Sequence, residues 1–337
     1  MNERSGAGGD KFTLKAVNVR GYYKTIRGYV KAVDGCSLAT HEGDIIGLAG
    51  ESGSGKSTLG KLLIGYNKPP LNLISGHVDI GNIKIYNLSW NERRKLWGSL
   101  VTMIPQYSMN SLNPVIKISD FIVDTIKQHS KEISKKDIIE KAIQRFDELQ
   151  LSQSVLNMYP FELSGGMKQR VVIVASTLLN PSVIVADEPT SALDVSTQRA
   201  LLELLYKIVK QKIVKSMVII SHDIATLYQI SNYVYIMYAG KVVEASNTEE
   251  LIGDPLHPYT KILINAVTTP EPTTRKQKLV SMSGAPPNLL NPPIGCRFYH
   301  RCPFAMEKCK SEEPPLWEIK PGRFVACWLY KNGVSYG

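Results

Sequence analysis

Residues 50–57 have the sequence Gly-Glu-Ser-Gly-Ser-Gly-Lys-Ser, the residue types and spacing of a phosphate-binding loop. Residues 45–49, directly before it, form a short apolar run that predicts a buried strand. The glycines of the loop allow a turn tight enough to point successive N–H groups at a phosphate, and a helix beginning near Lys56 adds the positive end of its dipole. We expect Lys56 to reach the β- and γ-phosphates and the Ser57 hydroxyl to ligate Mg²⁺. The predicted nucleoside triphosphate site contains Gly50, Ser52, Gly53, Ser54, Gly55, Lys56, Ser57 and Thr58.

Two adjacent carboxylates, Asp187 and Glu188, follow the apolar run at residues 183–186, which is typical of a buried strand. Because neighbouring strand residues point to opposite sides, the two can have different roles. We expect Asp187 to hold Mg²⁺ and Glu188 to accept a proton from an attacking water, a role that contributes roughly 10²- to 10⁴-fold in rate. For this pair taken alone, an ordinary solvated strand end is the alternative.

Gln106 and His222 follow two further strand-like runs, at residues 101–105 and 218–221. Gln106 could reach both the metal ion and the attacking water, and His222 could hydrogen-bond the γ-phosphate. A single histidine is more often a satisfied structural residue, so both predictions depend on the neighbouring motifs.

Residues 163–170, Leu-Ser-Gly-Gly-Met-Lys-Gln-Arg, form a second candidate surface for phosphate. Ser164 can cap a helix that runs through Leu179, and Gly165 and Gly166 leave the first N–H groups open to an anion. An ordinary capped helix would be the favoured interpretation of this stretch by itself. The chain therefore has two candidate phosphate-binding surfaces but one phosphate-binding loop.

The elements that must position these residues indicate an α/β fold. Residues 11–49 alternate apolar and polar positions, as in an antiparallel β region. Residues from about 90 to 179 are mainly helical in pattern and predict an inserted helical subdomain. Strand-like and helical runs then alternate at 183–186, 199–211 and 217–220, which predicts a parallel core sheet with crossover helices.

Prolines become frequent beyond residue 251 and favour an extended linker. We therefore expect a nucleotide-binding domain at residues 1–252 and a linker followed by a small cysteine-rich module at residues 253–337.

Composition narrows the class of protein. The 337 residues are 43% hydrophobic, and no run approaches the roughly 18 to 20 consecutive apolar residues of a membrane-spanning helix. Residues 1–10 have no apolar signal region, so a cytoplasmic protein is expected. The net charge of +10 permits contact with anionic lipid or nucleic acid, although a diffuse excess of surface lysine is the commoner cause.

Four of the five cysteines lie in the C-terminal segment, with the spacing Cys-x5-Cys-x6-Cys-x17-Cys. Cytoplasmic thiols stay reduced, so a metal site is the main alternative to unrelated buried thiols. Four thiolates suit tetrahedral Zn²⁺ or a [4Fe-4S] cluster, and this spacing does not decide between them. Cys327 best suits the buried-thiol alternative, because it lies in the mostly apolar run at residues 324–330.

Taken together, the motifs resemble the full motif set of an ATP-binding cassette ATPase over about residues 11–250. The resemblance is carried, in order, by residues 50–58, Gln106, residues 163–169, Asp187 and Glu188, residues 191–194, and His222.

The resemblance implies that two cassettes clamp two ATP molecules head to tail. Ser164, Gly165 and Gly166 would then complete the partner's ATP site, and Asp194 would lie at the dimer contact. The family pattern also places an aromatic residue against adenine, for which we expect Tyr29.

Three further stretches resemble the ATPase subunits of oligopeptide and dipeptide importers. They are residues 110–115, residues 257–260 (His-Pro-Tyr-Thr) and residues 284–309. The same subfamily also includes importers of sugar oligomers. The resemblance implies a subunit at the cytoplasmic face of the membrane that powers import. Its partners would be a second, unlike ATPase subunit, two transmembrane permease subunits and an extracytoplasmic solute-binding protein. Members with this tail can carry an iron–sulfur cluster, which favours a [4Fe-4S] cluster over zinc, held by Cys296, Cys302, Cys309 and Cys327.

Two alternatives belong to other functional classes. DNA-repair and translation ATPases share this cassette, but they carry inserted coiled coils or zinc modules, or two cassettes in one chain, and these features are missing here. We therefore expect no nucleic-acid partner. A nucleotide sensor without turnover is the other alternative, and the presence of both Glu188 and His222 disfavours it.

Overall fold

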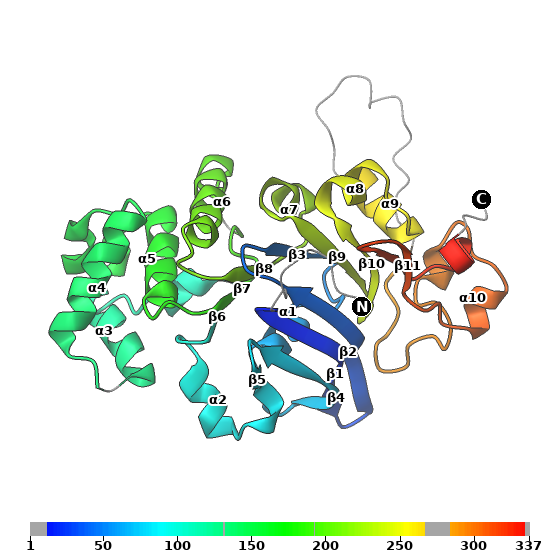
Figure 1. Cartoon of the computed structure of the whole chain (residues 1–337), viewed down its shortest axis with the longest axis horizontal. Helices are drawn as coiled ribbons and strands as arrows, with labels where there is room; N and C mark the ends of the chain where they lie inside the picture. The colour runs from blue at the N-terminus through cyan, green and yellow to red at the C-terminus, as the bar shows by residue number, and fades with distance from the viewer. Residues whose placement is uncertain (1–11, 131, 192, 267–283, 334–337) are drawn as a thin grey trace.

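The computed structural model describes residues 12–130, 132–191, 193–266 and 284–333. Within them, helices gather at one end of an elongated molecule, two β-sheets form the middle, and the C-terminal segment forms the other end (Figure 1). The predicted linker residues 267–283 and residue 192 of the 191–194 motif lie outside the described residues.

The larger sheet contains eight strands in the order β11-β12-β10-β9-β3-β8-β7-β6. The strands in its middle and at one edge are parallel and buried almost throughout, as their uninterrupted apolar runs predict for a sheet covered on both faces. These parallel strands are β3 (Ile45–Ala49), β6 (Val101–Ile104), β7 (Val183–Asp187), β8 (Ser216–Ser221) and β9 (Tyr233–Tyr238).

The other end of this sheet is antiparallel, so the core sheet is mixed rather than wholly parallel as predicted. β10 (Lys241–Asn247) pairs antiparallel with β9, and β12 (Arg323–Val325) pairs antiparallel with β10 and with β11 (Trp317–Lys320). The predicted boundary after residue 252 therefore separates two stretches of sequence that share one sheet.

The smaller sheet is antiparallel, as predicted for the N-terminal region, and has the order β2-β1-β4-β5. Helix α1 (Lys56–Leu63) lies between the two sheets and buries Leu59, Leu62 and Leu63 in the core that they share. The strands of this sheet are β1 (Leu14–Thr25), β2 (Gly28–Thr40), β4 (Leu71–Ile80) and β5 (Ile83–Lys84).

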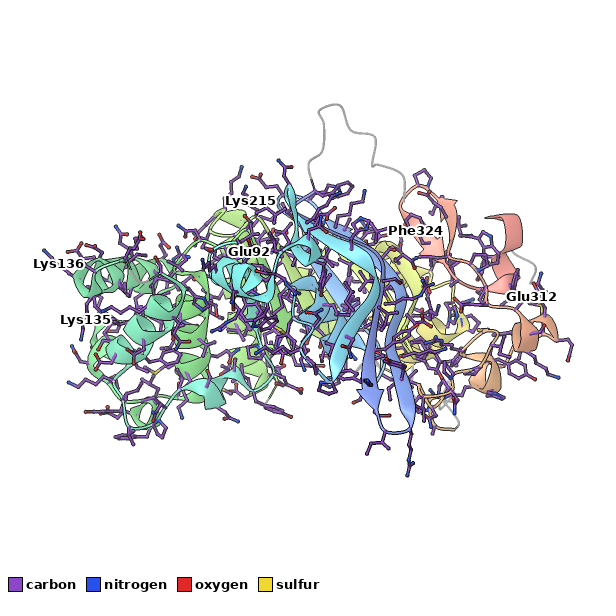
Figure 2. All side chains as sticks on the ribbon, turned by 90° about the horizontal axis from the view of Figure 1, so that it is seen from below. Glu92, Lys135, Lys136, Lys215, Glu312 and Phe324 are labelled. Atoms are coloured by element: carbon purple, nitrogen blue, oxygen red, sulfur yellow. The ribbon has the colours of Figure 1, made fainter. Side chains whose placement is uncertain are left out.

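The helical end carries an amphipathic helix at the predicted place. Ile138, Ala142 and Phe146 are fully buried in α4, while Lys135 and Lys136 point outward at the tip (Figure 2). The interval 90–179 is not helical throughout, because β6 lies inside it and pairs with β7. Its helices are α2 (Trp90–Leu96), α3 (Ile118–His129), α4 (Lys135–Glu148) and α5 (Gly165–Thr177).

Further helices cover the larger sheet on the face opposite α1, and no helix among the described residues is both long and apolar enough to cross a membrane (Figure 1). They are α6 (Val195–Lys210), α7 (Ile224–Ile230), α8 (Thr248–Gly253) and α9 (Pro258–Asn265), and the short α10 (Lys308–Ser311) follows in the C-terminal segment.

Candidate nucleotide-binding site

The predicted site residues meet at the carboxyl ends of the parallel strands of the larger sheet, which we call the phosphate-binding edge. Ala49, the last residue of β3, is level with Ser221 of β8, and Asp187 of β7 is level with Ile220. The residues that follow β3, β7 and β8 are therefore neighbours, as the strand-end positions in the sequence predict.

Two glycines of the loop sit where a side chain would collide with backbone. A Cβ on Gly50 would lie 2.1 Å from the Met237 carbonyl oxygen, and one on Gly55 would lie 2.0 Å from that of Ala32. Gly55 also has a φ of +104°, which favours glycine, and α1 begins at the next residue. The loop therefore holds its shape through close backbone packing against β2 and β9.

Lys56 is 6% exposed and lies inside the loop that it follows. Its Nζ donates to the Gly50 carbonyl at 2.7 Å and to the Glu51 carbonyl at 2.9 Å. Burial lowers the pKa of Lys56, and the nearby carboxylates of Glu188, Asp187 and Glu51 act in the opposite direction. The ammonium group is thus enclosed by the segment that is expected to cradle the phosphates.

Ser57 and Asp187 provide two hard oxygen atoms at the same place, as a Mg²⁺ site requires. The Ser57 hydroxyl donates to Asp187 Oδ1 at 3.1 Å, although the two residues are 130 positions apart. Asp187 is 4% exposed, and burial raises the pKa of its carboxyl group. A bound cation would offset that cost, so the donor set fits the predicted metal ion.

Glu188 and His222 form a pair beside this carboxylate. The backbone N–H of His222 donates to Glu188 Oε1 at 3.0 Å, and His222 Nδ1 lies 2.8 Å from the same oxygen. The His222 side chain is 68% exposed and that of Glu188 is 10% exposed. His222 thus contacts the predicted general base, which the sequence pattern does not indicate, and its hydrogen bond to the γ-phosphate stays a prediction.

Gln106 lies just beyond β6, beside the end of β7, and is exposed. The short helical turn after it, at residues 108–111, is tied to α5 because the Ser108 hydroxyl donates to Gln169 Oε1 at 3.2 Å. Gln169 is 3% exposed. The loop that carries Gln106 is therefore connected to the helix that carries the predicted serine–glycine motif.

Three tyrosines stand in the β region before the loop. The Tyr22 hydroxyl donates to Asp34 at 2.7 Å, and the Tyr23 hydroxyl lies 3.1 Å from Thr58 Oγ1. Tyr29 is 46% exposed. Of the three, the ring of Tyr29 is the most open to an incoming base, and its adenine role stays a prediction.

Ser164 caps α5 as predicted, its Oγ accepting the Met167 N–H at 3.3 Å. Ser164 and Gly165 are exposed and Gly166 is half-buried. The helix ends at Thr177, close to the predicted Leu179. Among the described residues, no hydrogen bond joins this motif to the phosphate-binding loop of the same chain. Ser164 and Gly165 are thus accessible to a molecule outside this chain.

Asp194 caps the neighbouring helix α6. Its carboxylate accepts the N–H of Thr197 at 3.0 Å and hydroxyl groups of Ser196 and Thr197 at 2.5 and 2.6 Å. These hydrogen bonds hold the pKa of Asp194 well below its usual range. The predicted dimer-contact residue therefore also has a structural role within its own chain.

The predicted cysteine ligands lie within electrostatic reach of one another. Burial, with a smaller contribution from neighbouring thiols, raises the pKa of Cys296 to about 11 and that of Cys327 to about 12. Among the residues that the structure describes, no three His, Cys, Asp or Glu side chains are arranged to hold a metal ion. The iron–sulfur cluster and its zinc alternative stay predictions.

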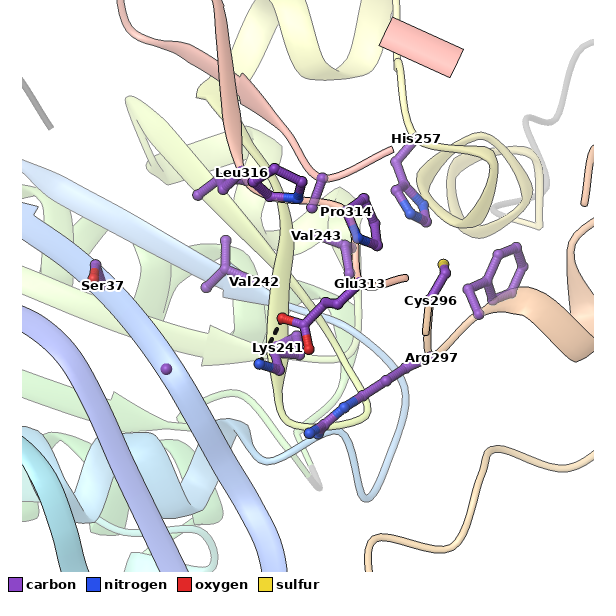
Figure 3. Close-up of a pocket in the computed structure, with 14 residues that line it drawn as sticks. Ser37, Lys241, Val242, Val243, His257, Cys296, Arg297, Glu313, Pro314 and Leu316 are labelled. Atoms are coloured by element: carbon purple, nitrogen blue, oxygen red, sulfur yellow. Dashed lines mark hydrogen bonds and ion pairs between the residues drawn. The ribbon is translucent and has the colours of Figure 1, made fainter. Parts of the chain in front are cut away.

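A cavity of about 200 Å³ is lined by residues of β2, β10 and the C-terminal segment, and Lys241 forms an ion pair with Glu313 along its wall (Figure 3). Cys296, Arg297 and the buried His257 also line it. Burial lowers the pKa of His257 to about 3, so this side chain is neutral at physiological pH. None of the lining residues belongs to the phosphate-binding loop.

The sequence reasoning also missed the C-terminal contacts of the loop. The Tyr259 hydroxyl accepts the Glu51 N–H at 2.7 Å, and Arg301 binds the Glu51 carboxylate. Tyr259 belongs to the His-Pro-Tyr-Thr stretch, which signalled only a resemblance. For Arg301 the sequence holds no signal beyond its position before Cys302.

Comparisons with known proteins agree with this geometry. A family model described as "ABC transporter" matches residues 33–191, and one described as "Oligopeptide/dipeptide transporter, C-terminal region" matches residues 243–309. The dimeric structure of a post-hydrolysis state of the ATP-binding cassette MJ0796, bound to ADP and Pi, is 28% identical with a TM-score of 0.60, covering 70% of this chain and 98% of that one. The cbiO1 structure from Clostridium perfringens, 23% identical with a TM-score of 0.63 and covering 73% and 92% of the two chains, shares the fold. The fold is that of an ATP-binding cassette ATPase.

Two relatives match almost the whole chain. The dipeptide transport ATP-binding protein DppD of Caldanaerobacter subterraneus subsp. tengcongensis is 38% identical over 95% of this chain and 98% of its own length. The oligopeptide transport ATP-binding protein OppD of Escherichia coli K12 is 36% identical over 94% and 92%. The chain belongs to the family of ATP-binding proteins of oligopeptide and dipeptide ABC transporters, which confirms the predicted resemblance.

Proposed function

We propose that this chain is the ATP-hydrolysing subunit that powers import of oligopeptides, or related small solutes such as oligosaccharides, through a membrane ABC transporter. The observation that carries the proposal is the Ser57–Asp187 hydrogen bond, which brings the phosphate-binding loop and the carboxylate strand end together. The names of the relatives, as transport ATP-binding proteins, favour transport over action on nucleic acid or ribosomes.

The catalytic roles follow from the positions of the side chains. The N–H groups of the loop and Lys56 bind the β- and γ-phosphates of ATP, and Tyr29 stacks on adenine. Ser57, Asp187 and Gln106 hold Mg²⁺, which when bound neutralises charge on the phosphate oxygens. Glu188, oriented by His222, accepts a proton from the attacking water.

Hydrolysis takes place between two cassettes. Ser164, Gly165 and Gly166 contact the ATP of the partner, and Asp194 lies at the dimer contact. The exposure of Ser164 and Gly165 supports this arrangement. We propose an unlike second ATPase subunit, two permease subunits that receive the motion of the helical insert, and an extracytoplasmic solute-binding protein. The subunit would then be peripheral, at the cytoplasmic face of the membrane.

The C-terminal segment has a finer proposed role. Residues 1–252 form the nucleotide-binding domain, and residues 253–337 add a linker and a module in which Cys296, Cys302, Cys309 and Cys327 hold a [4Fe-4S] cluster. The hydrogen bond from the Cys296 N–H to the Cys309 carbonyl, at 2.8 Å, supports the proximity of these two residues. Anaerobic purification tests this proposal: brown protein with iron and sulfide supports the cluster, and colourless protein with zinc supports Zn²⁺ instead.

The transport function is tested by co-expression with the permease subunits and the second ATPase in membrane vesicles. We expect ATP-dependent uptake of a labelled peptide, and loss of both uptake and hydrolysis in Glu188→Gln. Glu203→Gln, an exposed change on α6, is the matched control. Normal hydrolysis by Glu188→Gln would contradict the assigned base. Hydrolysis without peptide uptake by the complete assembly would argue for a different solute.

A further inference from the structure

Arg301, in the C-terminal segment, binds a side chain of the phosphate-binding loop. Arg301 binds the Glu51 carboxylate with both terminal nitrogens, Nη1 to Oε2 at 2.8 Å and Nη2 to Oε1 at 3.0 Å. The side chains of Arg301 and Glu51 are 6% and 24% exposed, so water screens the pair only in part. Bidentate arginine–carboxylate pairs are among the strongest charged hydrogen bonds in proteins and fix direction as well as distance.

Glu51 connects this arginine to the lysine that is expected at the phosphates. Its carbonyl oxygen accepts Lys56 Nζ at 2.9 Å and the Ser54 N–H at 3.1 Å, while its own N–H donates to the Tyr259 hydroxyl at 2.7 Å. The residue is thus held through its side chain, its N–H and its carbonyl. A shift of Glu51 would change the position of Lys56.

Arg301 stands on a rigid aromatic base. Tyr238, Tyr259 and Phe298 are almost fully buried, and their ring centroids lie between 4.7 and 5.5 Å apart. Arg301 Nη1 donates to the Tyr238 hydroxyl at 3.2 Å, and the Arg301 N–H donates to the Phe298 carbonyl at 2.9 Å. The guanidinium group is therefore preorganised toward the loop.

Charge gives the second reason for this arrangement. Glu51 places a carboxylate in the loop that must receive a triphosphate, and like charges at short range oppose binding. Arg301 forms an ion pair with that carboxylate and neutralises its charge. Removal of Arg301 would leave an uncompensated, partly buried negative charge in the loop.

We propose that Arg301 is a positioning residue for ATP binding: from the cysteine-containing segment it holds Glu51 and thereby sets the shape and charge of the phosphate-binding loop. The proposal rests on the proposed ATPase function. It makes the C-terminal segment a part of the nucleotide site, although Arg301 itself touches no phosphate.

The test measures affinity and turnover in the full-length protein. We expect Arg301→Ala to raise the Kd for a fluorescent ATP analogue and the KM for ATP by about tenfold, because the bidentate contact with Glu51 is lost, with a much smaller change in kcat. Arg301→Lys should lie between wild type and Arg301→Ala, because it keeps the charge and loses the bidentate geometry.

The matched control is Arg323→Ala. Arg323 is another buried arginine of the C-terminal segment, its side chain also 6% exposed, but its partner is Asp254, at 3.0 Å, far from the loop in sequence. Arg323→Ala should leave the Kd for ATP within about twofold of wild type, because this substitution affects only the general stability of the protein. Equal weakening by Arg301→Ala and Arg323→Ala would overturn the proposal.

A double-mutant cycle with Glu51→Gln completes the test. Arg301→Ala should change the Kd less in the Glu51→Gln background than in wild type, because the two side chains act as a pair. The same fold-change in both backgrounds, or no change in wild type, would overturn the proposal. If Arg301→Ala does not fold, Arg301→Gln and Arg301→Lys provide the same comparison. Wild-type protein that binds no ATP would instead overturn the proposed function.

Discussion

The phosphate-binding edge and the C-terminal segment differ in what holds their important side chains in place. At the edge, Ser57, Asp187 and Glu188 meet because three parallel strands end level with one another. The C-terminal segment is joined to the cassette by a short antiparallel strand pair and by ion pairs from Arg297 and Arg301. Backbone hydrogen bonds thus determine the geometry of the first region, whereas ion pairs of long side chains hold much of the second region in place.

The difference has a consequence for stability and for prediction. A site built on strand ends tolerates changes in the surrounding side chains, since the backbone ladder sets its geometry. A segment fastened by ion pairs is sensitive to pH, salt and single substitutions. The following changes test whether the two regions respond in these different ways.

The largest effect is expected from Lys56→Ala. Loss of the enclosed ammonium group removes the charge that we propose binds the β- and γ-phosphates, so ATP affinity should fall by about 10²-fold or more. Calorimetric titration with ATP and Mg²⁺ measures the change. Lys68→Ala, an exposed lysine beyond α1, should bind like wild type. Normal turnover by Lys56→Ala would refute the assignment of the loop.

Two glycine substitutions separate backbone collision from backbone strain. Gly55→Ala should destabilise the fold by roughly 3 kcal/mol, because its Cβ would meet the Ala32 carbonyl oxygen at 2.0 Å. Gly53→Ala should cost only about 1 kcal/mol, because its φ is +78° but no atom lies within 4 Å of the new Cβ. Urea unfolding of both variants measures the difference. Equal losses would show that packing against β2 does not shape the loop.

Asp187→Asn should stabilise the nucleotide-free protein while abolishing Mg²⁺-dependent turnover. Burial raises the pKa of Asp187, so its ionised form destabilises the empty fold at neutral pH. The neutral amide removes this penalty, and we expect the Tm at pH 7 to rise by about 3 °C. The gain over wild type should shrink as the pH falls and Asp187 becomes protonated. A lower Tm at pH 7 would argue that the carboxylate stabilises the edge through Ser57.

The smallest effect concerns the ion pairs of the C-terminal segment. Burial alone would raise the pKa of Asp34, but the Tyr22 hydroxyl and the charges of Lys241, Arg297 and Arg20 outweigh burial and lower it. A carboxyl group with a lowered pKa stabilises the fold at pH values above its unfolded-state pKa of about 4. This stabilisation is lost as the pH falls further. Asp34→Asn should therefore lower the Tm at pH 7 and flatten its decline below about pH 4. Parallel curves for the two proteins would contradict this account.

Most of the phosphate-binding edge could be predicted from the sequence, because each part is local. An apolar run before Gly50, another before Asp187 and a third before His222 identify three strand ends, and parallel strands bring such ends together. The serine cap of α5 was predictable for the same reason.

The contacts made over long distances were not predictable. Arg301 and Glu51 are 250 residues apart, and no periodicity connects an arginine beside a cysteine with a carboxylate in a glycine-rich loop. The addition of β12 to β10 involves only two register pairs and has no alternating pattern long enough to detect. Sequence periodicity records which face of an element is buried, but it does not record which distant side chain completes a contact.

The pairing of β12 with β10 also bears on how the protein tolerates shortening. Without residues 317–325, the outer side of β10 would present unpaired N–H and C=O groups to solvent, and such an edge recruits strands from other molecules. A fragment that ends after α8 would keep every nucleotide motif and yet be prone to self-association. The tail therefore protects solubility, whether or not its cysteines bind a metal.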